Sequence, residues 1–178
     1  MTLISEQQLP SIIKRLAHQI LETYPGLENA VIVGLQPRGV FLSDKIVAAL
    51  QKEIDPSLVQ YGKLDITFFR DDIRRELHLG SETNLPFSIE GKIVILIDDV
   101  LYTGRTIRAA MDAMLGYGRP SSVELLVFVD RRFTRNLPIE ATYVGRSVDS
   151  IDSQRVSVEW AKTEGEDKVL MFSTDKEK

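Results

Sequence analysis

Short, unbroken runs of aliphatic residues alternate along this chain with segments in which apolar residues recur every three or four positions. The runs at 30–34, 93–97 and 123–129 have the length and composition of strands buried on both faces of a sheet. The helical spacing occurs at 9–21, 42–50 and 107–115. Strands that alternate with helices predict an α/β fold, in which helices flank a central, mainly parallel sheet.

Shorter elements complete this pattern. Residues 64–69 alternate between apolar and polar and predict one more strand, while 155–160 and 168–172 predict a C-terminal pair of strands. Residues 70–91 open with a cluster of charges and predict an exposed, mobile loop. With 178 residues, 43% of them hydrophobic, the chain supports one well-cored domain over 1–178, with at most a small appendage.

One stretch joins a buried strand to candidate chemistry. Asp98 and Asp99 directly follow the run at 93–97, and a short turn then leads into a helix. The turn consists of Thr103, Gly104, Arg105 and Thr106. It lies where the free N–H groups of a helix start gather, its glycine lets a ligand approach the backbone, and its side chains add donors, as in a phosphate site. The spacing of a P-loop and the glycines of a dinucleotide fingerprint are absent.

The acidic pair indicates which other groups the ligand carries. Two carboxylates beside a phosphate would repel it, so Asp98 and Asp99 are expected to face sugar hydroxyls or a Mg²⁺ that bridges to further phosphates. A ligand with a 5-phosphate, a ribose and a pyrophosphate satisfies both halves of the stretch.

The nine residues 98–106, Asp-Asp-Val-Leu-Tyr-Thr-Gly-Arg-Thr, resemble the signature with which type I phosphoribosyltransferases bind phosphoribosyl pyrophosphate. Their sequence is most similar to that of the pyrimidine operon attenuators that are also uracil phosphoribosyltransferases. The resemblance implies that uracil and phosphoribosyl pyrophosphate react, with Mg²⁺, to give UMP and pyrophosphate. It also implies that Asp98 and Asp99 hold the ribose and the metal, and that the turn binds the 5-phosphate. Purine-using relatives place a carboxylate near the base where this chain has Tyr102, which argues against purine salvage.

The loop after the first buried strand reads Gln36-Pro37-Arg38-Gly39. In the resembling family this loop binds pyrophosphate through backbone N–H groups and a non-trans peptide bond, and Arg38 matches the family's Arg-Gly. Pro37 stands where Thr is more usual. Because proline lowers the cost of a cis peptide from about 3 kcal/mol to under about 1 kcal/mol, a cis Gln36–Pro37 bond is one hypothesis and a plain turn proline the other.

Two further segments are expected to border the site. The resemblance implies that 70–91 is a flexible hood whose closure brings Arg70 against the leaving pyrophosphate and excludes water. Asp130 and Arg131 follow the run at 123–129. The carboxyl ends of strands are where open α/β sheets bind ligands, so these two residues are predicted in the site wall.

The polar face of the first predicted helix carries Lys14, Arg15 and His18. One interpretation is a solvated helix face. The other is an RNA contact, because the resembling attenuators use an Arg-x-x-His pair on this helix, and Arg146 stands for their usual Lys in a later matching segment. Glu140, which replaces a basic residue, opposes RNA binding. A specific mRNA leader is therefore a hypothetical partner.

Composition narrows the class of protein. The net charge of −4 is unlike that of a dominant nonspecific nucleic-acid binder, which is usually basic. The absence of cysteine excludes disulfides, thiol nucleophiles and Cys-ligated metals. No apolar run approaches the ~20 residues of a membrane span and the first residues lack the features of a signal peptide, so a cytoplasmic location is expected.

Two alternatives to the bifunctional interpretation stay open. In the first alternative, the chain is a catalytically weak, nucleotide-sensing RNA regulator. In the second, it is a phosphoribosyltransferase for another base such as orotate. No general base is evident. The family suggests a homodimer or a larger homo-oligomer, which the sequence itself does not address.

Overall fold

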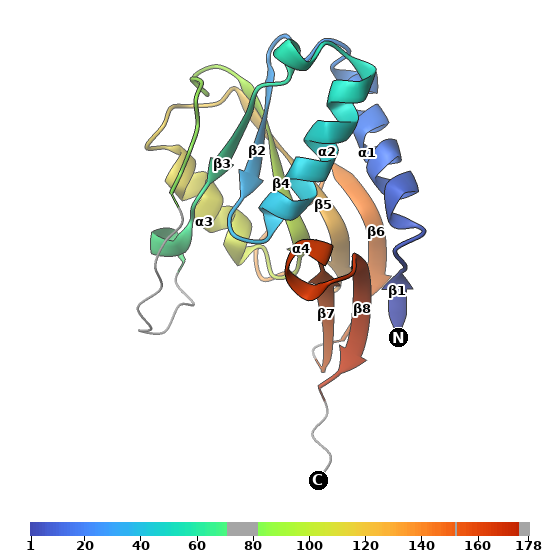
Figure 1. The fold of residues 1–178 in the computed structure, drawn as a ribbon. Helices are drawn as coiled ribbons and strands as arrows, with labels where there is room; N and C mark the ends of the chain where they lie inside the picture. The colour runs from blue at the N-terminus through green and yellow to red at the C-terminus, as the bar shows by residue number, and fades with distance from the viewer. Residues whose placement is uncertain (71–81, 152, 175–178) are drawn as a thin grey trace.

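The computed structural model describes residues 1–70, 82–151 and 153–174. Its centre is a parallel sheet in the order β3-β2-β4-β5-β6 (Figure 1). The strands are β2 (Ala30–Leu35), β3 (Tyr61–Leu64), β4 (Ile93–Leu101), β5 (Ser122–Arg132) and β6 (Tyr143–Asp149). Helices α1 (Leu9–Thr23) and α2 (Gly39–Glu53) cover one face and α3 (Arg105–Met114) covers the other. The predicted α/β fold with a parallel sheet is confirmed.

A smaller antiparallel sheet extends from the lower end of the domain in Figure 1. It has the order β1-β8-β7 and consists of β1 (Thr2–Ile4), β7 (Gln154–Glu159) and β8 (Lys168–Ser173). The predicted C-terminal strand pair is thus confirmed, and α4 (Ala161–Glu164) lies between its members. The strand β1 was not predicted, because three residues carry too little pattern.

The central strands are apolar on both faces because each face packs against helices. In β4, Ile95 and Ile97 belong to the core under α1 and α2, whereas Val94 and Leu96 belong to the core under α3. All four side chains are fully buried. Alternation of side chains across a strand explains why the sequence shows an unbroken aliphatic run here.

The strand predicted at 64–69 is wrong beyond its first residue. β3 ends at Leu64, and Thr67–Phe69 form a short 3₁₀ helix, η2. The Asp65 carboxylate accepts hydrogen bonds from the Thr67 N–H at 3.2 Å and the Thr67 hydroxyl at 2.7 Å. This local turn satisfies the backbone in place of a sheet ladder, a competition that apolar alternation does not reveal.

The expected apolar face of α3 is partly wrong. Ile107, Ala110 and Met114 are buried as predicted, but Met111 is 39% exposed and Leu115 is 65% exposed. The sheet instead contacts the small side chains of the helix, which include Ala109 and Ala113. Small residues let the helix approach the sheet closely, and Met111 and Leu115 are left at the margin of the interface.

The predicted hood is described only in part. Residues 71–81 lie outside the described residues, whereas within 82–91 the side chains of Leu85, Phe87 and Ile89 pack into the core under α3. Asn84 forms an antiparallel bridge with Lys63 of β3, and Ile89 is fully buried. Within the described part of the chain, no helix has the length and apolar character needed to cross a membrane.

A partly buried carboxylate joins the end of α1 to two strands of the sheet. Glu124 of β5 accepts a hydrogen bond from the Tyr24 hydroxyl at 2.5 Å and another from the Tyr143 hydroxyl of β6 at 2.7 Å. The hydrogen bond to Glu124 is the main cause that raises the pKa of Tyr24 to about 12. Each phenol therefore stays protonated and donates to the carboxylate at any physiological pH.

Replacement of Glu124 by Ala should lower the free energy of unfolding by about 2–3 kcal/mol, because two charge-assisted hydrogen bonds are lost and two phenols lose their acceptor. Urea unfolding measures the change. The matched control is Glu22→Ala, which removes an exposed carboxylate from α1 and should change stability by less than about 0.5 kcal/mol. Equal effects of the two variants would contradict a structural role for this cluster.

Candidate functional site

Three loops meet at the carboxyl ends of β2, β4 and β5. They are the loop at 36–38 before α2, the turn at 102–104 before α3, and the segment that follows Asp130. All three strands are parallel, so their carboxyl ends share one edge of the sheet. This is the edge at which open α/β sheets bind ligands, and it brings together the residues predicted from four separate stretches of sequence.

The acidic pair lies inside β4, not after it. The strand continues to Leu101 because β5 also continues, with Asp98 opposite Val127 and Leu101 opposite Asp130. Asp98 and Asp99 are 7% and 9% exposed. The sequence placed the pair just beyond the strand, because carboxylates are rarely part of a buried ladder.

Burial raises the pKa of both carboxyl groups, that of Asp98 most strongly, and the neighbouring Asp99 charge raises it further. For Asp99 the raising effect of burial is opposed by Arg38, whose Nε lies 3.2 Å from the Asp99 Oδ2 atom. The positive charge of Arg70 also acts to lower the pKa of Asp98. A further positive charge would therefore stabilise the ionised form of the pair.

A hard cation such as Mg²⁺ could provide this charge. No group of three or more potential metal-binding side chains occurs among the described residues, so the protein alone does not form a closed metal cage there. Two carboxylates are, however, the donor set with which Mg²⁺ is held together with substrate oxygens. Asp98 and Asp99 would hold the ion between them and the ligand.

The turn at 103–106 leads into α3, as predicted. Gly104 has a φ of +92°, and a Cβ atom there would lie 3.2 Å from the Ile139 side chain, so both conformation and space favour glycine. The backbone carbonyl of Thr103 accepts hydrogen bonds from the N–H groups of Asn136 and Leu137, which fixes the turn. A cavity of about 110 Å³ is lined by the turn. Its lining residues are Arg70, Val100, Leu101, Tyr102, Thr103, Gly104, Arg105, Thr106 and Ile107.

The loop before α2 lies against the acidic pair. The Gln36–Pro37 peptide is cis, as hypothesised, and the Gln36 side-chain amide donates to the Glu82 carbonyl at 2.7 Å. Gly39 begins α2, and a Cβ atom at Gly39 would lie 2.6 Å from the Ile97 carbonyl oxygen. Glycine is therefore required for the loop to come this close to β4.

Arg38 is held by groups from two distant parts of the chain. Besides its contact with Asp99, its Nη1 lies 3.2 Å from the Glu164 Oε1 atom in α4, and its Nη2 donates to the Val158 carbonyl of β7. The sequence predicted Arg38 but neither of these partners. No local signal could have identified them, because Glu164 is 126 positions away along the chain.

The opposite wall contains the predicted Asp130 and Arg131. Arg131 is buried, its guanidinium stacks on the Tyr102 ring at 3.9 Å, and its Nε donates to the Ser150 hydroxyl at 2.9 Å. Asp130 forms an ion pair with Arg135, which the sequence analysis missed. The Asp130 carboxylate is thus a structural anion in the described structure, and Arg131 supports an aromatic surface at the site.

The residues of the predicted RNA face have unequal surroundings. The Arg15 guanidinium donates to the carbonyls of Val144 and Gly145 at 3.2 and 2.6 Å, and that of Arg146 donates to the Leu3 carbonyl. Both arginines therefore hold backbone segments together. His18 differs, since its Nε2 lies 3.4 Å from the Oε1 atom of a glutamate in α2, Glu53.

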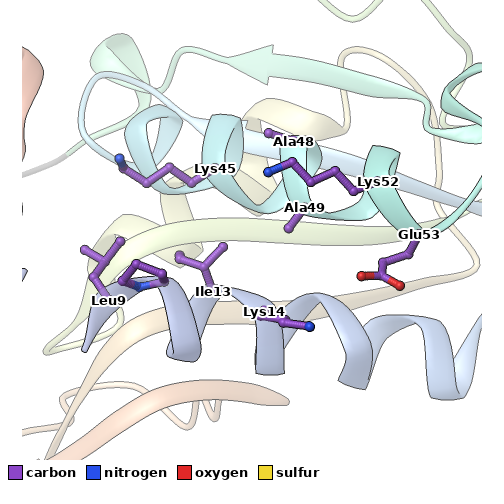
Figure 2. Close-up of a pocket in the computed structure, with 9 residues that line it drawn as sticks. Leu9, Ile13, Lys14, Lys45, Ala48, Ala49, Lys52 and Glu53 are labelled. Carbon is purple, nitrogen blue, oxygen red and sulfur yellow. The ribbon is translucent and has the colours of Figure 1, made fainter. Parts of the chain in front are cut away.

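Lys14 borders a groove of about 480 Å³ between α1 and α2 (Figure 2). Apolar side chains form much of its lining, and lysine side chains from both helices lie around it. The lining residues are Leu9, Pro10, Ile13, Lys14, Lys45, Ala48, Ala49, Lys52 and Glu53. Lys45 is paired with Asp167 at 2.6 Å, whereas Lys14 and Lys52 are exposed. The sequence did not predict this groove, because its two sides come from separate helices.

Comparison with known proteins gives consistent results. The family model described as phosphoribosyl transferase domain matches residues 3–163. A protein named Bifunctional protein PyrR from Pelotomaculum thermopropionicum is 44% identical over 162 residues, which are 90% of this chain and 88% of that protein. The protein of the same name from Bacillus cereus strain AH820 is 38% identical over 173 residues, 95% of each chain.

Solved structures of hypoxanthine phosphoribosyltransferases share the fold. The enzyme from Staphylococcus aureus, in its orthorhombic crystal form, has a TM-score of 0.68 at 18% identity and covers 95% of this chain and 90% of its own. The enzyme from Trypanosoma cruzi has a TM-score of 0.68 at 18% identity, with 96% and 89% covered. At this level of identity the likeness concerns the fold alone.

Replacement of Asp98 by Asn should stabilise the ligand-free protein. A buried carboxylate with a raised pKa costs stability once it is ionised, and an amide of the same shape removes that cost while it keeps the acceptor for the Asp99 N–H. The Tm at pH 8 should rise by about 2–5 °C.

Thermal unfolding at two pH values checks the sign. Near pH 4 the advantage of the variant should shrink, because the raised pKa means that the native carboxyl group already carries its proton there. A variant that is less stable than the wild type at pH 8, or a difference that does not vary with pH, would contradict this account.

Proposed function

Since the chain belongs to the phosphoribosyltransferase family and, within it, to the bifunctional PyrR proteins, we propose that it forms UMP and pyrophosphate from uracil and phosphoribosyl pyrophosphate, and that it also binds a pyrimidine operon leader RNA in response to UMP. One observation carries the enzymatic half. The acidic pair lies between a phosphate turn on one side and the Pro37–Arg38 loop on the other, which suits a ribose between two phosphate groups.

The protein would act mainly through position and charge. Transfer of the ribose to uracil develops positive charge on the sugar, so the buried carboxylates of Asp98 and Asp99 would stabilise it and hold the ribose hydroxyls. The turn at 103–106 would anchor the 5-phosphate. Arg38 would face the departing pyrophosphate, and Arg70, which lines the cavity at the turn, would add positive charge near it.

Mg²⁺ would neutralise charge on the pyrophosphate when it is bound, and Asp98 and Asp99 are the residues that would hold it. Tyr102 and Arg131 would form the pocket for the base. Their stacked pair offers a flat, aromatic surface to a base, and position 102 lacks the carboxylate that purine-using relatives place near the base. Orotate as the base remains the alternative within this reaction class.

Incubation of the protein with phosphoribosyl pyrophosphate, Mg²⁺ and uracil should produce UMP, while parallel reactions with orotate and hypoxanthine should not. Chromatography of the nucleotide products measures the outcome. Turnover with orotate alone would overturn the choice of base. Binding of UMP without turnover of any base would instead identify a nucleotide-sensing regulator that lacks the enzymatic activity.

The groove between α1 and α2 supports the RNA half of the proposal. Lys14 and Lys52 place positive charge on either side of it, and its apolar lining can accommodate an unstacked base, a form in which RNA sequence is often recognised (Figure 2). Arg15 and Arg146 already bond to the backbone, so we assign their main role to keeping α1 and β6 together. His18 borders the same helix face.

The Lys14→Ala and Lys52→Ala variants should bind a pyrimidine operon leader transcript more weakly than the wild type. Each should reduce the slope of log affinity against log salt concentration by about 1, because one phosphate contact is lost. Filter binding at several salt concentrations measures both quantities, and UMP synthesis should be unchanged.

The control for these variants is Lys92→Ala, a lysine that does not line the groove. It should bind RNA as the wild type does. Loss of affinity in Lys92→Ala equal to that in Lys14→Ala would show only a general effect of charge. We expect both functions in the cytoplasm, where transcripts are made, and an assembly of two or more copies, as in the resembling family.

A further inference from the structure

The C-terminal segment contributes directly to the pyrophosphate end of the site. Each of the three guanidinium nitrogens of Arg38 has a partner: Nε has Asp99, Nη1 has Glu164, and Nη2 has the Val158 carbonyl. Two of these three partners come from β7 and α4, outside the large sheet. Three of its five N–H donors are therefore engaged, and a phosphate that approaches any of the three nitrogens must compete with a partner already there.

The partners differ in how easily they can be given up. The side chain of Asp99 is 13% exposed, whereas that of Glu164 is 32% exposed and the Arg38 side chain is 42% exposed. An ion pair at the surface is weak, while a buried carboxylate that loses its cation is costly. Exchange of partners is therefore cheapest at Glu164, where water can solvate the released carboxylate.

Glu164 is also held ready in its place. The Trp160 N–H donates to its Oε2 atom at 2.8 Å, and the Thr163 hydroxyl donates to the same carboxylate; these bonds, that from Thr163 first, lower the pKa of Glu164. The turn itself is anchored, because Asp167 binds both the Lys45 ammonium at 2.6 Å and the Ala161 N–H at 2.8 Å. Glu164 therefore faces Arg38 without the need to order a mobile loop.

We propose that Glu164 is a positioning residue that occupies Arg38 in the ligand-free protein and yields it to the pyrophosphate group of phosphoribosyl pyrophosphate. The inference rests on the function proposed above. Pyrophosphate carries more negative charge than one carboxylate and offers several acceptor oxygens, so it can displace Glu164 from the Nη1 edge. When pyrophosphate leaves, Glu164 takes its place, and the carboxylate thereby limits how tightly this product is held.

The Glu164→Gln variant tests the proposal, because it removes the charge but keeps the shape and the acceptor for the Trp160 N–H. Inorganic pyrophosphate with Mg²⁺ should bind this variant about two- to fivefold more tightly than the wild type, the range that corresponds to one surface ion pair. The KM for phosphoribosyl pyrophosphate should fall by a similar factor, while the KM for uracil stays the same.

The matched control is Glu166→Gln, in the same turn. The Glu166 carboxylate accepts from Lys168 at 2.9 Å and has no contact with Arg38, so pyrophosphate affinity should match that of the wild type. Calorimetry gives the affinities, and thermal unfolding separates a structural effect from a binding effect.

Unchanged or weaker pyrophosphate binding in Glu164→Gln would overturn the proposal, whatever its Tm, and would make Glu164 a structural tie between the C-terminal segment and the sheet. A gain in affinity equal to that of Glu166→Gln would also overturn it, because net charge alone would then explain the gain. Pyrophosphate affinity is measured without uracil. A wild-type protein that binds pyrophosphate but makes no nucleotide would thus refute the enzymatic function and leave the exchange at Arg38 open to this test.

Discussion

Two adjacent carboxylates inside the central strand of the sheet are the constraint on which the site depends. Asp98 and Asp99 are almost fully buried, and burial raises the pKa of each. A protein tolerates such a pair only if positive charge is brought to it. Arg38 provides this charge from the start of α2, and Arg70 contributes from beyond η2. The surrounding loops are arranged so that a cationic or hydrogen-bonding ligand can supply the rest.

The same constraint makes the small C-terminal sheet part of the site. Arg38 reaches Asp99 while its other nitrogens contact β7 and α4, so the two sheets are connected through one guanidinium group. Trp160 strengthens the connection, since its fully buried ring packs against Phe128 of β5 at 5.8 Å and Phe41 of α2 at 6.2 Å. The C-terminal strand pair is therefore linked to the acidic pair both by these ring contacts and by Arg38.

The sequence was sufficient for the framework and for the centre of the site. Buried parallel strands leave continuous aliphatic runs, and the phosphate turn concentrates its chemistry in the nine residues 98–106, so both were predictable. Residues 65–69 were not, because a side-chain hydrogen bond from Thr67 to Asp65 replaced the strand that alternation favoured. Glu164, the partner of Arg38, and Ser150, the partner of Arg131, could not be predicted, since a tertiary contact leaves no periodic signal in the sequence.

Surface residues were the hardest to assign from sequence. The sequence shows which charged residues share one face of a helix, but it does not show which groups their side chains contact. Lys14 borders an open groove, whereas Arg15, its direct neighbour, bonds to β6. A solvated surface is therefore not the right description of Arg15, and an RNA contact at this face stays a prediction.

Both edges of the large sheet are covered by short contacts. β3 and β6 are its outermost strands. Asn84 bridges to Lys63 along β3, and the Arg15 guanidinium occupies two carbonyl groups of β6. An uncovered edge strand offers its backbone to a strand of another molecule and promotes aggregation. Arg15 therefore keeps part of the β6 backbone from pairing with a strand of another molecule.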